Sequence, residues 1–220
     1  MKMKPTFNKA MLACLMMSAG SALAAGPTAE LKITGTVSPG ACVPTLDAGG
    51  IVDFGETSIN DLPETGTLKL AAKELNGTLV CTGATKVAIS FADNRASSVP
   101  THTDEPTDAN TAFGLGTTTD GINIGSYSLA FTAIQGDGID GDLLSSANKT
   151  TWGKMAFNDK LNNQKATQYL SFATSGTSAP TEARAFNFTL KVEPSLSSDL
   201  RGITETANLD GNTTINFEYM

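Results

Sequence analysis

TTINFEYM, residues 213–220, alternates apolar and polar side chains almost to the last residue of the chain. Successive side chains of a β-strand point to opposite faces, so Ile215, Phe217 and Tyr219 share one face of an extended segment. The stretch is therefore predicted to be a strand with one buried face. An edge strand leaves a row of backbone groups open to another chain, so the fold depends on what pairs with this one.

The same alternation recurs along the chain and predicts an all-β protein. Glycine, proline, asparagine and aspartate separate the alternating stretches, and no convincing helical periodicity follows residue 24. Short strands at this spacing are typical of a β-sandwich. The polar stretch 92–121 is predicted to be a long surface loop. The clearest strands are expected at residues 29–37, 86–91, 122–134 and 185–192.

The first 24 residues have the features of a secretory signal peptide. Lys2, Lys4 and Lys9 precede the apolar run 10–17, and small residues end the segment. We expect cleavage after residue 24, which leaves a single domain over residues 25–220. No other segment reaches the roughly 20 apolar residues that a spanning helix needs, so we expect no membrane span.

The charge of the exported chain argues against nucleic-acid binding. The signal peptide removes three of the 15 Lys and Arg residues and none of the 22 Asp and Glu residues, so the net charge falls from −7 to −10. A nucleic-acid-binding domain needs a basic surface to contact phosphates, and this composition does not supply one.

The sequence also argues against catalysis and against a cofactor. His102 is the one histidine, and it lies in the polar loop far from any nucleophile motif. No glycine-rich phosphate loop precedes a helix, and no helix-borne nucleophile is present. We therefore expect no catalytic residue, no metal site and no cofactor.

Two cysteines remain after signal cleavage, Cys42 and Cys81. An exported chain with two cysteines most simply forms one disulfide. Two cysteines and one distant histidine cannot complete a tetrahedral metal site. A Cys42–Cys81 disulfide is therefore predicted.

The order of these features resembles the chaperone–usher pilins. Residues 33–37 (ITGTV) stand five residues before Cys42, Cys81 follows about 40 residues later, and the last strand has a penultimate tyrosine, Tyr219. Other stretches are similar to a fimbria-like family of unknown function, namely CVPTL (42–46), ATKVA (84–88), DNRA (93–96) and FGLG (113–116). The resemblance implies an immunoglobulin-like (pilin-type) β-sandwich that lacks its last strand.

The resemblance also implies partners and sites. In such pilins a periplasmic chaperone lends the missing strand, an outer-membrane usher assembles the fimbria, and the next fimbrial subunit replaces the chaperone strand. The protein would then pass from the periplasm to the cell surface. The chaperone or acceptor edge would consist of Ile215, Phe217, Tyr219 and Met220, and the donor or first strand of Leu31, Ile33, Gly35 and Val37.

The short segment before Cys42 leaves open the type of subunit and whether the chain is a fimbrial subunit at all. Residues 25–41 number only 17 and must supply both a first strand and any donor strand. A minor or tip subunit would tolerate a short arm better than a shaft subunit. The alternative is a monomeric exported binding module for a carbohydrate or a cell-surface partner. In that case the last strand would be paired internally and the loop 92–121 would carry the site.

Overall fold

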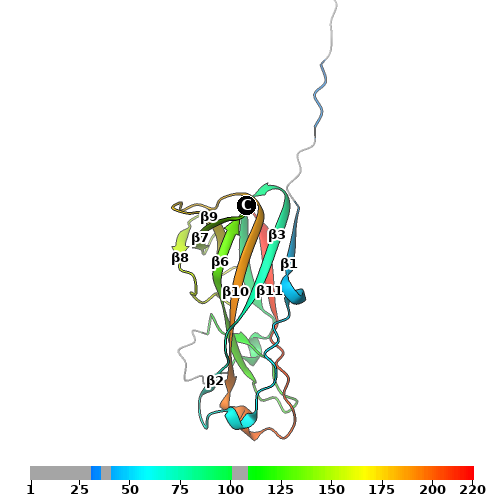
Figure 1. Cartoon of the computed structure of the whole chain (residues 1–220), viewed down its shortest axis with the longest axis vertical. Coiled ribbons are helices and arrows are strands. Elements are labelled where there is room, and N and C mark those ends of the chain that lie inside the picture. The colour runs from blue at the N-terminus through cyan, green and yellow to red at the C-terminus, as the bar shows by residue number, and fades with distance from the viewer. Residues whose placement is uncertain (1–30, 36–40, 101–108) are drawn as a thin grey trace, which may run out of the picture. The chain divides into compact units, whose positions relative to one another are not determined.

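The computed structural model of the protein describes residues 31–35, 41–100 and 109–220. The chain divides into two units, residues 1–37 and 38–220, and the described residues of the first, 31–35, form neither helix nor strand. The described part of the second unit consists of strands and short 3₁₀ helices (Figure 1). The strands are β1 Cys42–Leu46, β2 Thr67–Lys69, β3 Lys73–Thr85, β4 Val87–Asp93, β5 Phe113–Gly114, β6 Gly125–Gly136, β7 Ile139–Ser146, β8 Gly153–Met155, β9 Tyr169–Thr174, β10 Ala183–Ser197 and β11 Thr213–Tyr219; the 3₁₀ helices are η1 Asp47–Gly50, η2 Ile59–Asp61, η3 Ala96–Ser98 and η4 Ser198–Gly202.

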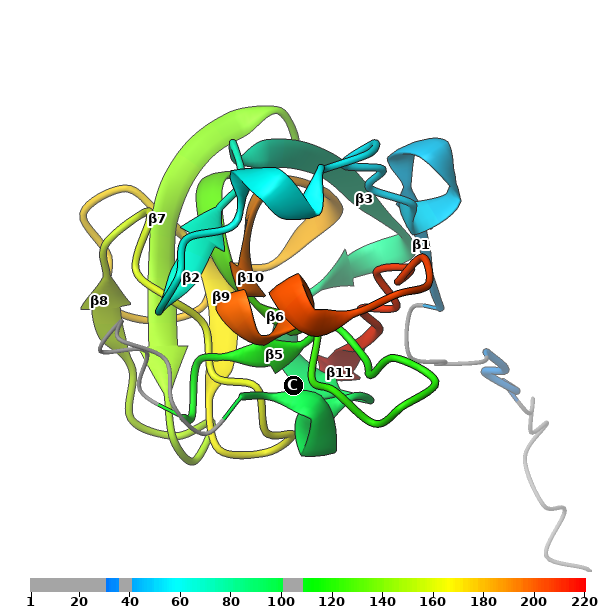
Figure 2. The same ribbon diagram turned by 90° about the horizontal axis from the view of Figure 1, so that it is seen from below.

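The strands form two antiparallel layers, visible end-on in Figure 2. One layer has the order β1-β3-β10-β6, with β2 beside β10 and β5 beside β6. The other has the order β8-β7-β9-β4-β11, and the β6–β7 turn joins the layers. Two antiparallel layers packed face to face around one core are the arrangement of the immunoglobulin-like sandwich. The predicted immunoglobulin-like β-sandwich is confirmed by these two layers.

Phenylalanine rings fill the space between the layers. Phe131 of β6 contacts Phe91 of β4 and Phe188 of β10 edge to face, with ring centroids 6.0 and 5.7 Å apart. Gly77 of β3 is needed here, because a Cβ on it would lie 2.2 Å from the Phe188 ring. The core is therefore continuous from one layer to the other.

The predicted disulfide is present. Cys42 and Cys81 are opposite each other in the β1–β3 register, and their sulfur atoms are bonded. The bond closes a loop between residues 39 positions apart. It attaches β1, the edge strand of its layer, to the strand beside it.

The first strand lies later in the sequence than the alternation of residues 29–37 predicted. Residues 31–35 carry no strand, and Leu31 and Ile33 are 86% and 87% exposed. Val37 lies outside the described residues. The register gives the reason: Cys42 is opposite Cys81 and Leu46 opposite Gly77, so residue 38 would be opposite Thr85, where β3 ends. The register of β1 thus reaches the end of β3 before the alternating stretch begins.

The stretch 92–121 is not wholly the surface loop that its composition predicted. Residues 101–108, including His102, lie outside the described residues. Phe113 is fully buried, pairs with Tyr127 in the β5–β6 register and stacks on its ring at 5.3 Å. Leu115 is also in the core. Phe113 and Leu115 are the apolar residues of the stretch that were expected to return it to the sheet, and they do so.

Replacing both cysteines by serine should lower the free energy of unfolding by up to about 4 kcal/mol, because the unfolded chain regains the freedom of the closed loop. Urea unfolding of the oxidised wild-type chain and the double variant measures the difference. The dithiothreitol-reduced wild type should behave like the variant. Equal midpoints for oxidised and reduced protein would contradict the prediction.

Candidate functional site: a groove between two sheet edges

The last strand is hydrogen-bonded on one edge. β11 pairs with β4 from Thr213 opposite Asp93 to Tyr219 opposite Val87. No described strand pairs with its other edge. Ile215 and Phe217 face the core and are half-buried. The strand predicted at residues 213–220 is thus present, and it forms one border of its layer.

The edges of the two layers meet at one end. The Tyr219 hydroxyl accepts a hydrogen bond of 3.0 Å from the backbone N–H of Cys42, the first residue of β1. Met220, next to it, donates its backbone N–H to the Lys86 carbonyl at 3.1 Å. Tyr219 and Met220 are 50% and 42% exposed. At this end a single tyrosine bridges the two layers.

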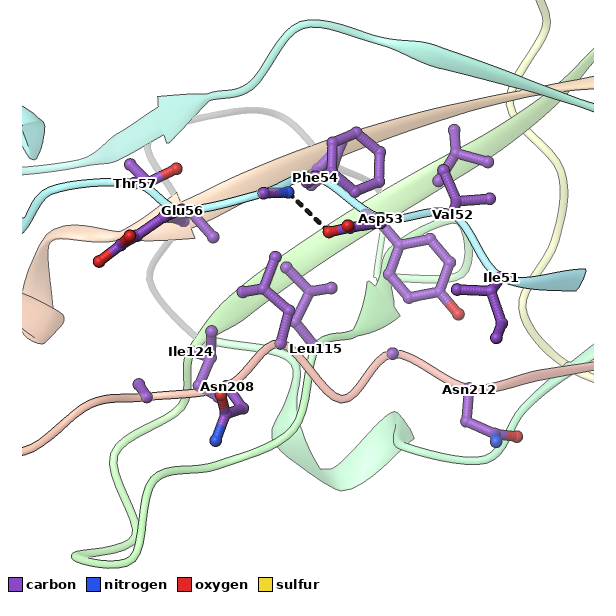
Figure 3. Close-up of a pocket in the computed structure, with 18 of the residues that line it drawn as sticks. Ile51, Val52, Asp53, Phe54, Glu56, Thr57, Leu115, Ile124, Asn208 and Asn212 are labelled. Atoms are coloured by element: carbon purple, nitrogen blue, oxygen red, sulfur yellow. Dashed lines mark hydrogen bonds between the residues drawn. The ribbon is translucent and has the colours of Figure 1, made fainter. Parts of the chain in front are cut away.

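Beyond this bridge a groove of about 1160 Å³ opens between the layers. One wall is the segment 50–59 after β1, and the other is the segment 203–213 before and into β11 (Figure 3). Leu115 and Ile124 lie between the two walls in this view. The rest of the floor is also mainly apolar and comes from β3, β6 and β10: Leu75, Tyr127, Leu129, Leu190, Val192 and Leu196.

The backbone of both walls is open to pairing. Neither residues 51–58 nor residues 203–212 form a described strand. In the first wall the Gly55 N–H donates to the Asp53 carboxylate at 2.8 Å. In the second wall the Ile203 N–H donates to the Leu200 carbonyl at 3.2 Å, and the Asp210 N–H donates to the Leu115 carbonyl at 2.9 Å. Among the described residues, no backbone hydrogen bond joins one wall to the other. An extended segment between the walls would find unpaired N–H and C=O groups beside it.

Large apolar side chains are exposed around the groove. Ile51 is 72% exposed, Ile59 42% and Leu209 37%, and all three line it. Exposed apolar side chains gathered around an apolar hollow mark an interaction site rather than ordinary surface. The occupant of this groove must therefore present apolar groups.

A polar clamp holds the second wall in place. The Arg95 guanidinium forms an ion pair with Asp210 at 2.7 Å. Asn94 donates its backbone N–H to the Asn212 carbonyl at 2.9 Å. Asp93 fixes the turn by accepting hydrogen bonds of 2.8 Å from the N–H groups of Arg95 and Gly114. The DNRA stretch, 93–96, thus orients one side of the groove.

Tyr127 connects the floor to the start of β11. Its hydroxyl is 2.6 Å from the Thr213 hydroxyl, and the residue is 8% exposed. Burial raises the pKa of Tyr127 to about 12. The tyrosine therefore stays neutral and hydrogen-bonded well above the pH at which a free tyrosine ionises.

The groove coincides with only part of the site expected from sequence. Ile215 lines it, whereas Phe217, Tyr219 and Met220 lie toward the bridged end. Sequence reasoning missed both walls, because polar residues and glycine outnumber apolar residues in both segments. Isolated apolar residues within those polar stretches were the available signal: Ile51, Val52, Phe54, Ile59, Ile203, Ala207 and Leu209.

No group of three His, Cys, Asp or Glu side chains suited to a metal occurs among the described residues. In the same part of the chain, no helix is long and apolar enough to cross a membrane. The groove is the feature of the described residues that best fits a macromolecular ligand.

Comparison with known proteins gives relatives without an assigned activity. Residues 31–111 match a family model described as a protein of unknown function, DUF1120. Protein GltF of Escherichia coli K12 is 30% identical, with 96% of each chain covered. The uncharacterized protein YhcF of the same strain is 27% identical over 87% of this chain and 90% of its own. Among solved structures, the P pilus rod subunit PapA aligns with 83% of this chain and 100% of its own, at 13% identity and a TM-score of 0.37.

Alkaline pH should test the buried tyrosine. Above the ordinary pKa of 10.0 the unfolded chain loses the Tyr127 proton, whereas the folded protein keeps it until about pH 12. The raised pKa of Tyr127 therefore contributes to the free energy of unfolding. This contribution is fully present below pH 10 and is lost as the pH rises toward 12. Between pH 9 and 12 the wild type should lose about 2 kcal/mol more unfolding free energy than Tyr127→Phe. Urea titrations at a series of pH values measure this, and parallel curves for the two proteins would refute it.

Proposed function

The chain belongs to the family of the Escherichia coli protein GltF, and we propose that it is a structural or minor subunit of a surface fimbria, completed by a β-strand that another protein donates. The observation that carries the proposal is the apolar groove between two wall segments, 50–59 and 203–213, which share no backbone hydrogen bond with each other among the described residues. It lies at the edge of β11, where the immunoglobulin fold would place its seventh strand.

Strand donation would use both the backbone groups of the groove walls and the apolar hollow between them. Backbone groups of the donated strand pair with the open walls, and alternate side chains enter the apolar hollow. Leu129 and Leu190 on the floor, with Ile51 and Leu209 at the rim, would then be covered from water. Burial of apolar surface supplies roughly 25 cal/mol per Å², so the donated strand would contribute substantially to folding stability.

The position of β1 supports a donor role for the segment before it. Residues 29–37 alternate as AELKITGTV, and the disulfide-bonded strand begins only at Cys42. The first strand therefore does not use Leu31 or Ile33, whose exposure matches what a donor segment needs. Nine extended residues span about 30 Å, enough to follow a groove of several strand residues. Leu31, Ile33, Gly35 and Val37 are proposed as the donor side chains.

Export of the chain would bring it into contact with further partners in the periplasm and at the outer membrane. The disulfide fits an oxidising compartment. We propose that a periplasmic chaperone occupies the groove first, contacting Ile215, Phe217, Tyr219 and Met220, and that an outer-membrane usher exchanges it for another subunit. The role is structural and requires no catalytic residue or cofactor.

A charge at the rim should block strand capture without unfolding the protein. A peptide of residues 29–37 should raise the melting temperature of the chain 25–220 by about 5 °C at saturating concentration, because it binds the folded state. Ile51→Asp should remove that rise, since burying an unpaired carboxylate costs several kcal/mol. The side chain is 72% exposed in the free protein, so the variant alone should keep its stability.

Val43→Asp is the matched control for this experiment. Val43 is 66% exposed and does not line the groove, so its variant should respond to the peptide like the wild type. A stable monomer with no response to the peptide would instead favour the binding module. Loss of the response in both variants would show that the effect is not specific to the groove.

A further inference from the structure

The rim of the groove is strongly acidic. Residues 46–66 contain five carboxylates and no Lys or Arg, and residues 198–212 contain three carboxylates and one Arg. Every charged residue that lines the groove itself is acidic: Asp53, Glu56 and Glu205. The stretches 46–66 and 198–212 together hold 8 of the 22 acidic residues of the chain, and four of the eight lie in the wall segments themselves.

One cation lies close to the groove lining: the Lys73 ammonium donates to the backbone carbonyl of Asp53 and lies 5.3 Å from the centroid of the Phe54 ring. Asp210 is paired with Arg95, and the Arg201 guanidinium donates to the backbone carbonyl of Leu62. Glu56 and Glu205 are exposed, and neither forms an ion pair with another described residue. Carboxylates on both sides of a hollow with apolar walls reinforce one another's field. The opening therefore carries a negative potential.

A strand in the groove would place its second face in this field. Its apolar side chains enter the hollow, and the intervening side chains point outward between the two walls. Neutral or acidic residues at those outward positions gain nothing or are repelled, whereas Lys and Arg are attracted.

We propose that the strand that fills this groove comes from a different, basic protein, and carries Lys or Arg on its outward face. The inference rests on the proposed function and specifies the partner of the same site. A second copy of this chain fits poorly: the chain has a net charge of −7, and its own donor stretch offers Glu30 and Lys32, which cancel. Charge complementarity thus favours a heterotypic partner over self-assembly.

Three peptides that share their apolar residues test this proposal. They are residues 29–37, the same peptide with Glu30→Lys, and the same peptide with Lys32→Glu, with side-chain charges of 0, +2 and −2. Fluorescence anisotropy with the chain 25–220 should give about ten-fold tighter binding for the +2 peptide than for the −2 peptide at low salt. The ratio should fall to about two-fold at 0.5 M NaCl, because salt screens exposed charges.

Substitutions in the protein identify the charges responsible. Glu56→Gln with Glu205→Gln should reduce the low-salt ratio to about three-fold, because two rim charges are lost. The control is Asp140→Asn with Glu182→Gln, which makes the same change of net charge at two exposed residues that do not line the groove. This control should keep the ratio of the wild type.

The outcomes separate the two proposals. Equal binding of the three peptides, with binding abolished by Ile33→Asp in the peptide, would overturn the basic partner and leave strand donation standing. The same ratio in the rim and control variants would also overturn it, because the preference would then reflect net charge alone. Failure of all three peptides to bind would overturn strand donation and this inference with it.

Discussion

The backbone of β11 is hydrogen-bonded to β4 on one side and to no described strand on the other. Another strand at that edge would cover the part of the core beneath it. In the described residues Ile215 and Phe217 are only half-buried, and leucines of β3, β6 and β10 line an open groove. Unpaired edges and exposed apolar surface are features that soluble monomers normally avoid.

The rest of the structure holds this opening in a defined shape. The Phe91, Phe131 and Phe188 cluster joins the two layers behind the floor. The disulfide attaches β1 to β3 on one side, and the Arg95–Asp210 pair holds the wall before β11 on the other. Tyr219 bridges the layers at one end. A preorganised groove loses less conformational entropy when it receives a strand than a flexible one would.

Because the chain belongs to the GltF family, the role of the groove can also be asked of its relatives. GltF aligns with 96% of this chain, so the relationship spans nearly the whole protein rather than one motif. The DNRA stretch, 93–96, falls within the residues matched by the family model. In this protein the side chains of residues 93–96 hold one wall of the groove in place. The stretch therefore has a structural role.

Local patterns in the sequence were enough to predict the all-β class, the Cys42–Cys81 disulfide and the strand at residues 213–220. Alternation is a property of neighbouring residues, and two cysteines leave a single pairing. The start of the first strand and the site were decided by tertiary structure. Residues 29–37 alternate as well as any strand, yet the described residues among them, 31–35, form none, and the β1–β3 register begins at Cys42. Among the described residues the groove walls form no strand before β11 begins at Thr213, and polar residues and glycine outnumber the apolar ones in both. They become a site only because the sandwich places residues 50–59 opposite residues 203–213, some 150 positions apart, on either side of an uncovered core.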